Sequence, residues 1–510
     1  MSVVKLSASF IVRRRDWLFA GLILFVAVLM RFWHFASLPP GVTTTEALIG
    51  LQAQNLLSHG WLPGMNAING YAPIFVWLQA SAIAVFGSST WALRVWPALL
   101  GVGSVIAVWY WGSSWFNARV AGVAAFVLAV TPWAIMIARN GTPTALAPLL
   151  TCLTFLFAGY AYTKRSSVWR FGLVVFLFVD LMAGPLGWAI AASCLLLSII
   201  QIIRTRYWGR PGVASIGIIV SALIGSAIVS LMFVASFGAL KGIGNAAVLV
   251  TSFHVATDTI ARTLFMFNLQ GDDSFAHNLG GQPLLNVFVG LMFIAGILVT
   301  ISRTHERRSR VLLALFVMLM IPAFVSSAGV PNAAHAAAVL PVVMLLVALG
   351  VSYMIELWFA TFPVNSAARS MGQAAIIVLL CLTFFQGYTQ YFWAWAGTSE
   401  AHVVYNESAV ASAKFLSASK FNGLEYLVGK PSELPVGAYI TNSKPPYTSL
   451  TPELLTVLPI GAGARQFVIT GPASHQIQQT LTAKFPGGLL KPYVSKFSGS
   501  ELFYVYEVSK

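Results

Sequence analysis

Charged side chains are scarce in this sequence. Of its 510 residues, Asp, Glu, Lys and Arg make up only 9% and hydrophobic residues make up 58%, whereas an average soluble domain is about 25% charged. A chain of this composition cannot cover a globule with polar groups, which excludes an ordinary water-soluble protein. Apolar runs of the ~20 residues that a membrane-spanning helix needs recur as far as Trp395. The sequence therefore predicts an integral membrane protein surrounded by membrane lipids.

Cysteine is almost absent as well. The three cysteines, Cys152, Cys194 and Cys381, lie within apolar runs, where a thiol behaves as a small hydrophobic side chain. Their positions exclude a disulfide framework and provide no metal-ligand spacing. The sequence itself demands no metal or other cofactor.

Acidic residues are half as frequent as basic ones, with 15 Asp and Glu against 30 Lys and Arg, and the net charge is +15. From residue 396 onward nine Lys and Arg stand against seven Glu. The basic excess therefore lies among the apolar runs and their short connections. No basic stripe with interleaved aromatic residues is present, which argues against nucleic acid as a partner.

Twelve apolar runs are candidates for spanning helices: 17–37, 71–87, 91–112, 119–137, 145–162, 168–184, 186–203, 212–236, 284–302, 310–327, 334–357 and 371–395. Lys and Arg concentrate in short cytoplasmic loops. If the run 71–87 does not cross, sixteen Lys and Arg fall on the cytoplasmic side, and the outer loops before residue 396 hold only Arg139, Lys241 and Arg262. We therefore predict about eleven spans in the plasma (inner) membrane, with an uncleaved first helix, a cytoplasmic N-terminus and an extracytoplasmic C-terminus.

The first outer loop, 39–90, has its own helix signals. The run Thr43-Thr44-Thr45-Glu46 is typical of a helix start, with a Thr cap and an acid in the first turn, and the helix should continue through Leu57 to a stop at Gly60. The short run 71–87 fits a helix that lies in the membrane interface. Another long outer loop is expected at 237–283, later in the chain.

The composition changes after Trp395. We expect a helix near 404–418, strands at Gly437–Thr441, Gln466–Thr470 and Leu502–Val508, and a helix at Ser474–Lys484. The predicted fold class is thus an all-α polytopic membrane protein, residues 1–395, with interfacial helices in the first outer loop. A small extracytoplasmic α/β soluble domain follows at 396–510.

Several short motifs occur in an order that points to one family. They are Pro39-Pro40-Gly41, Glu46-Ala47, Leu57-Ser58-His59-Gly60, Tyr71-Ala72-Pro73, Leu93-Arg94-Val95-Trp96-Pro97, Pro132-Trp133, Ala138-Arg139, Gly271-Asp272, His277-Asn278 and Pro331-Asn332-Ala333-Ala334-His335. Together they resemble the C-type superfamily of membrane glycosyltransferases, and within it the bacterial protein O-mannosyltransferase and aminoarabinose-transferase-like proteins. The resemblance covers most of the chain.

The resemblance implies a mechanism. A polyprenyl-phosphate sugar donor would lie in a groove between helices, an acid of the first outer loop would deprotonate the acceptor or help to bind a divalent metal such as Mg²⁺ or Mn²⁺, and basic groups would stabilise the departing phosphate. The acceptor, whether lipid, protein or cell-wall glycan, stays open. The chemistry agrees, because a carboxylate suits a proton acceptor and Arg suits a developing phosphate charge.

This chain departs from the family pattern at four polar positions. Thr45 replaces the Asp that the resemblance makes catalytic, and Thr144 replaces an acid of the second outer loop, which lies between the runs 119–137 and 145–162. Tyr71 stands where a Lys or His usually opens the interfacial helix, and His335 stands where the family has Arg. These changes leave two functions open, an active transferase and a catalytically degenerate glycolipid-binding scaffold of the same fold.

Glu46 is the candidate catalytic base, with a purely helix-stabilising role as the alternative. The candidates for binding the lipid phosphate or substrate are Arg94, Arg139, His335, Tyr71, Asp272 and His277. Asp180 is a further candidate because an acid within a span is often functional. A secondary transporter is the remote alternative, since no paired, broken helices are evident.

Overall fold

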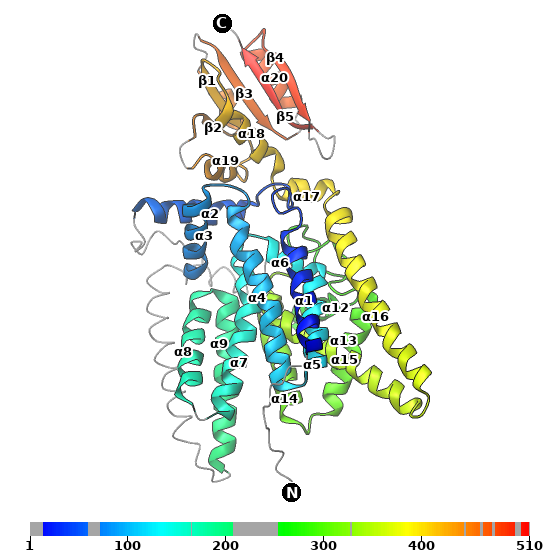
Figure 1. Cartoon of the computed structure of the whole chain (residues 1–510). Coiled ribbons are helices and arrows are strands. Elements are labelled where there is room, and N and C mark those ends of the chain that lie inside the picture. The colour runs from blue at the N-terminus through cyan, green and yellow to red at the C-terminus, as the bar shows by residue number, and fades with distance from the viewer. Residues whose placement is uncertain are drawn as a thin grey trace.

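The computed structural model describes residues 14–59, 72–164, 166–207, 253–326, 329–442, 445–459, 463–471, 475–494 and 501–508. Figure 1 shows a helical bundle with a small domain of mixed helices and strands standing on one end. Tyr71, the predicted span 212–236 and part of the outer loop 237–283 lie outside the described residues.

The helices of the bundle and its loops follow the predicted apolar runs. They are α1 (Arg14–Phe32), α2 (Thr44–His59), α3 (Pro73–Phe86), α4 (Ala92–Trp115), α5 (Ala118–Val130), α6 (Pro132–Arg139), α7 (Leu146–Thr163), α8 (Ser167–Met182), α9 (Pro185–Tyr207), α12 (Phe253–Phe265), α13 (Val287–Ser302), α14 (Arg307–Phe324), α15 (Leu340–Thr361) and α16 (Ser366–Thr389). Helix α16 continues as a π-helical segment, Gln390–Trp395. Helix α12 was not predicted.

Among the described residues, four helices are long and apolar enough to cross a membrane by length and composition, or five if the pair α5 and α6 counts as one span. That pair bends by 62° at Pro132, which has no N–H to continue the hydrogen-bond ladder. The membrane-protein class agrees with these helices. By this criterion the described residues contain four or five spans, fewer than the eleven predicted.

The segment that contains α3 leaves and rejoins the bundle at the same end. Before α3, the Thr44 hydroxyl donates to the Ser432 carbonyl (2.8 Å), and after α3 the Ser88 hydroxyl donates to the Asn442 side chain (3.1 Å). Both acceptors belong to the C-terminal domain, so the chain returns to that domain on either side of α3. This placement agrees with the prediction that the run 71–87 does not cross.

The C-terminal domain begins with α17 (Ser399–Val404) and α18 (Glu407–Ala418). Its sheet has the order β2-β1-β3-β5-β4, formed by β1 (Leu424–Val428), β2 (Thr448–Leu450), β3 (Arg465–Thr470), β4 (Leu489–Val494) and β5 (Glu501–Val508). Strands β2, β1 and β3 are parallel, and β3, β5 and β4 are antiparallel. The predicted strands at 466–470 and 502–508 are confirmed, as are the helix near 404–418 and the helix α20 (His475–Lys484).

One predicted strand is wrong. Residues 437–441 do not pair in the sheet but belong to α19 (Leu434–Ile440). Pro435 occupies the first turn of α19, where a missing N–H costs nothing, and Val436 and Tyr439 are buried on one helical face. Tyr439 packs against Gly50 of α2, where an added Cβ would meet its ring at 2.5 Å. Packing against α2 therefore outweighs the local β-type pattern.

Helices α13 and α15 pack with their backbones in contact. A Cβ at Gly296 would overlap the Leu346 carbonyl oxygen, and a Cβ at Gly350 would overlap the Met292 carbonyl oxygen. We expect Gly296→Val to destabilise the bundle by more than the ~1–3 kcal/mol of ordinary overpacking, because the obstacle is backbone. Thermal unfolding in detergent measures the loss.

Gly103→Ala is the matched control for this variant. Its Cβ would meet the Leu149 side chain at 3.5 Å, an ordinary contact. An unfolding midpoint for Gly296→Val equal to that of Gly103→Ala would contradict the close packing of α13 on α15.

Candidate active site

The candidate site lies at the end of the bundle that carries the C-terminal domain (Figure 1). Glu46 comes from the first turn of α2, Arg94 from the start of α4 and Arg139 from the end of α6. Asp272 and His277 belong to the loop between α12 and α13, and His335 belongs to the loop before α15. The described candidates, with the exception of Asp180, thus converge from five segments on one place.

Glu46 is fully buried and its carboxylate is saturated with donors. Thr43 N–H donates to Oε2 (2.8 Å) and Gly141 N–H donates to Oε1 (2.6 Å). Glu46 N–H in turn donates to the Thr43 hydroxyl (3.2 Å), so Thr43 and Glu46 form a reciprocal capping box at the start of α2. The predicted helix start is confirmed, and Gly141 lets the second outer loop approach Glu46 closely.

Arg94 provides the counter-charge for Glu46. Its guanidinium lies 3.4 Å from each carboxylate oxygen, and both side chains are at most 1% exposed. Arg94 also donates to the carbonyls of Pro39 (2.8 Å) and Gly41 and lies 5.6 Å from the ring centre of Tyr405. The ion pair therefore fixes the first outer loop to α4 and to the C-terminal domain.

Arg139 caps the end of α1. It donates to the carbonyls of Arg31 (3.0 Å) and Leu38 (2.9 Å), and also to those of Met30 and His34 (each 3.3 Å). The last carbonyls of a helix lack partners within the helix, so a buried guanidinium can satisfy several at once. Aromatic rings enclose it, with Tyr391 and Phe392 at 5.4 and 5.2 Å from Cζ.

Arg31 was missed as a site residue. It is 1% exposed and donates to the carbonyls of Leu128 (3.0 Å) and Ala129. Because Pro132 lacks an N–H, the Leu128 carbonyl receives no hydrogen bond from within the helix. Arg31 supplies the missing donor. The available signal was a charge within an apolar run, which is rare without a function or a partner.

Arg31 and Arg139 have no ion pair with a carboxylate in the part of the chain that the structure describes. Both are buried, and a buried charge without a counter-ion is costly. The positive charge of this end of the bundle is therefore left uncompensated beside the outer loops, which favours an anionic ligand.

Asp272 ties two loops together. Its Oδ1 accepts from Ser274 N–H (2.8 Å) and its Oδ2 accepts from Ala333 N–H (2.9 Å), two residues before His335. The neighbouring Asp273 is exposed. Asp272 thus holds the loop that carries His277 against the loop that carries His335.

The two histidines are the titratable groups of the site that are partly accessible. Burial lowers the pKa of His277, while the charges of Asp272 and Glu46 oppose the shift. Burial also lowers the pKa of His335, and the neighbouring His277 adds to the effect. At neutral pH both imidazoles are therefore uncharged, and a neutral imidazole can accept a proton.

Two other predicted positions lie differently. Thr45, at the position where the resemblance implies a catalytic Asp, is exposed, next to the buried Glu46. Asp180 lies apart on α8, buried, with Oδ2 accepting from the Thr154 hydroxyl (2.8 Å). Within the described residues no group of three or more His, Cys, Asp or Glu could hold a metal ion.

Residues 71–227 match the family described as dolichyl-phosphate-mannose-protein mannosyltransferase. Two proteins of Bacillus subtilis provisionally named mannosyltransferases are similar over short stretches. YycA is 35% identical over 68 residues, 13% of this chain and 10% of the relative, and YkcB is 30% identical over 97 residues, 19% of this chain and 14% of the relative. The matched stretches thus span about a tenth and a seventh of these relatives.

Similarity to solved structures extends over nearly the whole chain. The fold is similar to that of ArnT from Cupriavidus metallidurans bound to undecaprenyl phosphate, with a TM-score of 0.55, 14% identity and coverage of 97% of this chain and 98% of ArnT. The apo oligosaccharyltransferase of Archaeoglobus fulgidus has a TM-score of 0.55 and 12% identity, with coverage of 95% of this chain and 70% of that protein. The chain therefore has a fold similar to those of ArnT and the archaeal oligosaccharyltransferase, and its residues 71–227 are similar to the mannosyltransferase family.

Proposed function

We propose that the protein transfers a sugar from a polyprenyl-phosphate donor to an acceptor on the side of the C-terminal domain. The observation that carries the proposal is the convergence of buried arginines and two neutral histidines at the loop end of the bundle. Arg31 and Arg139 supply positive charge without a carboxylate partner in the described ranges. The ArnT fold, which covers 97% of this chain, is known with undecaprenyl phosphate bound.

In the proposed reaction, the acceptor hydroxyl oxygen attacks the anomeric carbon of the donor sugar. The bond between that carbon and the phosphate oxygen breaks, and the polyprenyl phosphate leaves with the electron pair. The field of Arg31 and Arg139 stabilises the charge that develops on this phosphate. The acceptor loses its proton to a base of the site.

We assign the base to His277 in preference to Glu46. A base must come within hydrogen-bond distance of the acceptor, but Glu46 is fully buried and both its oxygens are occupied by Thr43, Gly141 and Arg94. His277 is partly accessible, and burial lowers its pKa. Glu46 then acts as a positioning residue that orders the first outer loop.

A second candidate function is a glycolipid-binding scaffold without turnover. It is supported by the exposed Thr45 in place of the family's Asp. It is also supported by the hydrogen bonds that already occupy both carboxylate oxygens of Glu46. A scaffold needs the same positive end of the bundle, but it needs no base.

The test uses the purified protein in lipid nanodiscs with polyprenyl-phosphate hexose and pentose donors, a membrane extract as acceptor source, and Mg²⁺ or Mn²⁺ present or absent. Release of polyprenyl phosphate measures turnover, and retention of labelled donor measures binding. Turnover with one donor supports the transferase. Donor binding without turnover supports the scaffold, and neither binding nor turnover with any donor overturns both.

A further inference from the structure

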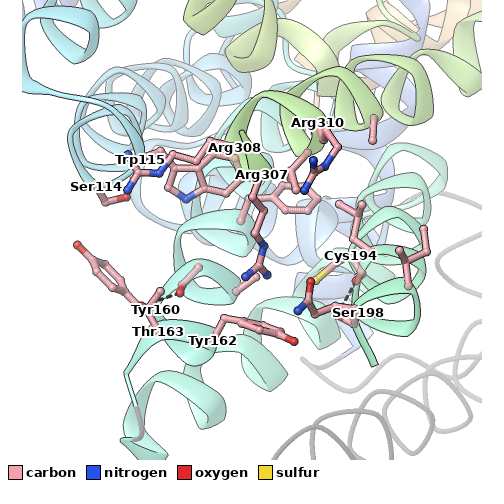
Figure 2. A pocket seen from close by; sticks show the side chains of 18 residues that line it. Ser114, Trp115, Tyr160, Tyr162, Thr163, Cys194, Ser198, Arg307, Arg308 and Arg310 are labelled. Carbon is pink, nitrogen blue, oxygen red and sulfur yellow. Dashed lines mark hydrogen bonds between the residues drawn. The ribbon is translucent and has the colours of Figure 1, made fainter. Parts of the chain in front are cut away.

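A cavity lies at the end of the bundle opposite the candidate active site. Its volume is about 460 Å³, within the range of small-molecule pockets, and it is bounded by the ends of α4, α7 and α9 and by the start of α14. Figure 2 shows its labelled side chains, with Arg307 directed toward Tyr162. No residue of the candidate active site lines this cavity.

One rim of the cavity is strongly basic. Arg307, Arg308 and Arg310 follow one another along the first turn of α14 and line it. None of them forms an ion pair with a carboxylate among the described side chains. Glu356, at the same end of the bundle, forms its ion pair with Arg303 (3.2 Å). Among the ion pairs of the described side chains, this rim therefore keeps its positive charge.

The opposite wall is aromatic and apolar. The Arg307 guanidinium lies 4.6 Å from the ring centre of Tyr162, and deeper in the cavity Phe155, Leu197 and Val311 form its lining. From Tyr162 to Phe155 the lining follows α7 for about 10 Å, at ~1.5 Å per residue. A cationic rim that continues into an apolar wall fits a ligand with one anionic end and one hydrocarbon end.

We propose that this cavity binds an anionic phospholipid of the surrounding membrane, with its phosphate on Arg307 and Arg308 and the first part of an acyl chain against Phe155 and Leu197. Guanidinium groups bind phosphate oxygens through paired, charge-assisted hydrogen bonds. The positive-inside distribution places this arginine cluster at the leaflet that is rich in anionic lipid. The proposal does not depend on the transferase proposal, because it concerns the other end of the bundle.

The experiment titrates delipidated, detergent-solubilised protein with phosphatidylglycerol, with phosphatidylcholine of the same chains and with glycerol phosphate, and counts bound molecules by native mass spectrometry. We expect phosphatidylglycerol to bind at least about tenfold more tightly than either of the others, since one charge-assisted contact contributes about a factor of ten. Arg307→Gln and Arg308→Gln should each lower this affinity about tenfold. Glycerol phosphate that binds as tightly as the lipid would overturn the assignment to a membrane lipid.

Two further variants separate this cavity from general surface charge. Arg303→Gln removes one charge at the same end of the bundle without touching the cavity lining, and it should leave the affinity within about twofold. Ala158→Phe keeps all arginines and fills the apolar wall, and it should lower phosphatidylglycerol binding as strongly as Arg307→Gln. An equal loss in Arg303→Gln, or no loss in Ala158→Phe, would overturn the proposal.

Discussion

The Glu46→Gln variant is expected to lose about 3–5 kcal/mol of folding free energy, because it leaves Arg94 buried without its counter-charge. Each carboxylate oxygen of Glu46 faces one backbone N–H and one guanidinium nitrogen. Whichever oxygen becomes an amide NH₂ group will face two donors and can accept from neither. The first outer loop should therefore detach from α4 and from the second outer loop.

Thermal unfolding of the purified variant in detergent, followed by tryptophan fluorescence, measures this loss. Thr45→Val is the matched control, since Thr45 is the exposed neighbour of Glu46 on the same turn of α2, and its midpoint should equal that of the wild type. A Glu46→Gln protein that unfolds at the wild-type midpoint but has lost donor turnover would instead make Glu46 the base.

The His277→Asn variant is expected to keep its fold and its donor affinity but to lose turnover by about 10²–10⁴-fold, the usual contribution of a general base. The loss should fall on kcat and leave the KM for the donor unchanged, because the field that attracts the donor phosphate comes from the arginines. Steady-state rates over a range of donor concentrations separate the two constants. Asparagine preserves polarity and approximate size, so the loop between Asp272 and Asn278 should persist.

The pH dependence of turnover gives the wild-type protein its own test. The base is the neutral imidazole, so activity disappears as the pH falls through the pKa of His277. Because burial lowers this pKa from its ordinary value of 6.5, turnover should stay constant from neutral pH to below 6.5 and decline only there. His59→Asn, which removes an exposed histidine, should retain wild-type turnover. A decline that begins above pH 7, or unchanged turnover in His277→Asn, would place the base elsewhere.

The sequence predicted those parts of the fold that local rules govern. The capping box of α2 follows from Thr43 and Glu46 alone, and the return of the chain around α3 follows from the distribution of Lys and Arg. The error at 437–441 has the opposite origin. Helix α19 is stabilised by contact with α2, almost 400 positions earlier in the chain, and no local pattern records that contact.

The candidate residues could be predicted from the order of motifs, but their roles could not. From the sequence alone, Glu46 and Arg94 are both expected to be polar groups near the membrane surface. Their pairing depends on a contact between positions 48 residues apart. Arg139 reads as a free loop cation, yet its donors are occupied by the carbonyls at the end of α1. The sequence identifies a charged side chain. Whether that side chain is free to bind a ligand depends on backbone groups that only the fold brings near it.

The seating of α19 on α2 has a consequence for biosynthesis. Gln54 of α2 donates to the Tyr439 carbonyl (2.9 Å), and the Tyr439 hydroxyl donates to the Ser89 carbonyl (3.0 Å). The loop that carries α2 is thus completed by a helix translated almost 400 positions later. The nascent chain must therefore keep an incomplete first loop until α19 has been translated, so the site is assembled only after the helices between α2 and α19 have been made.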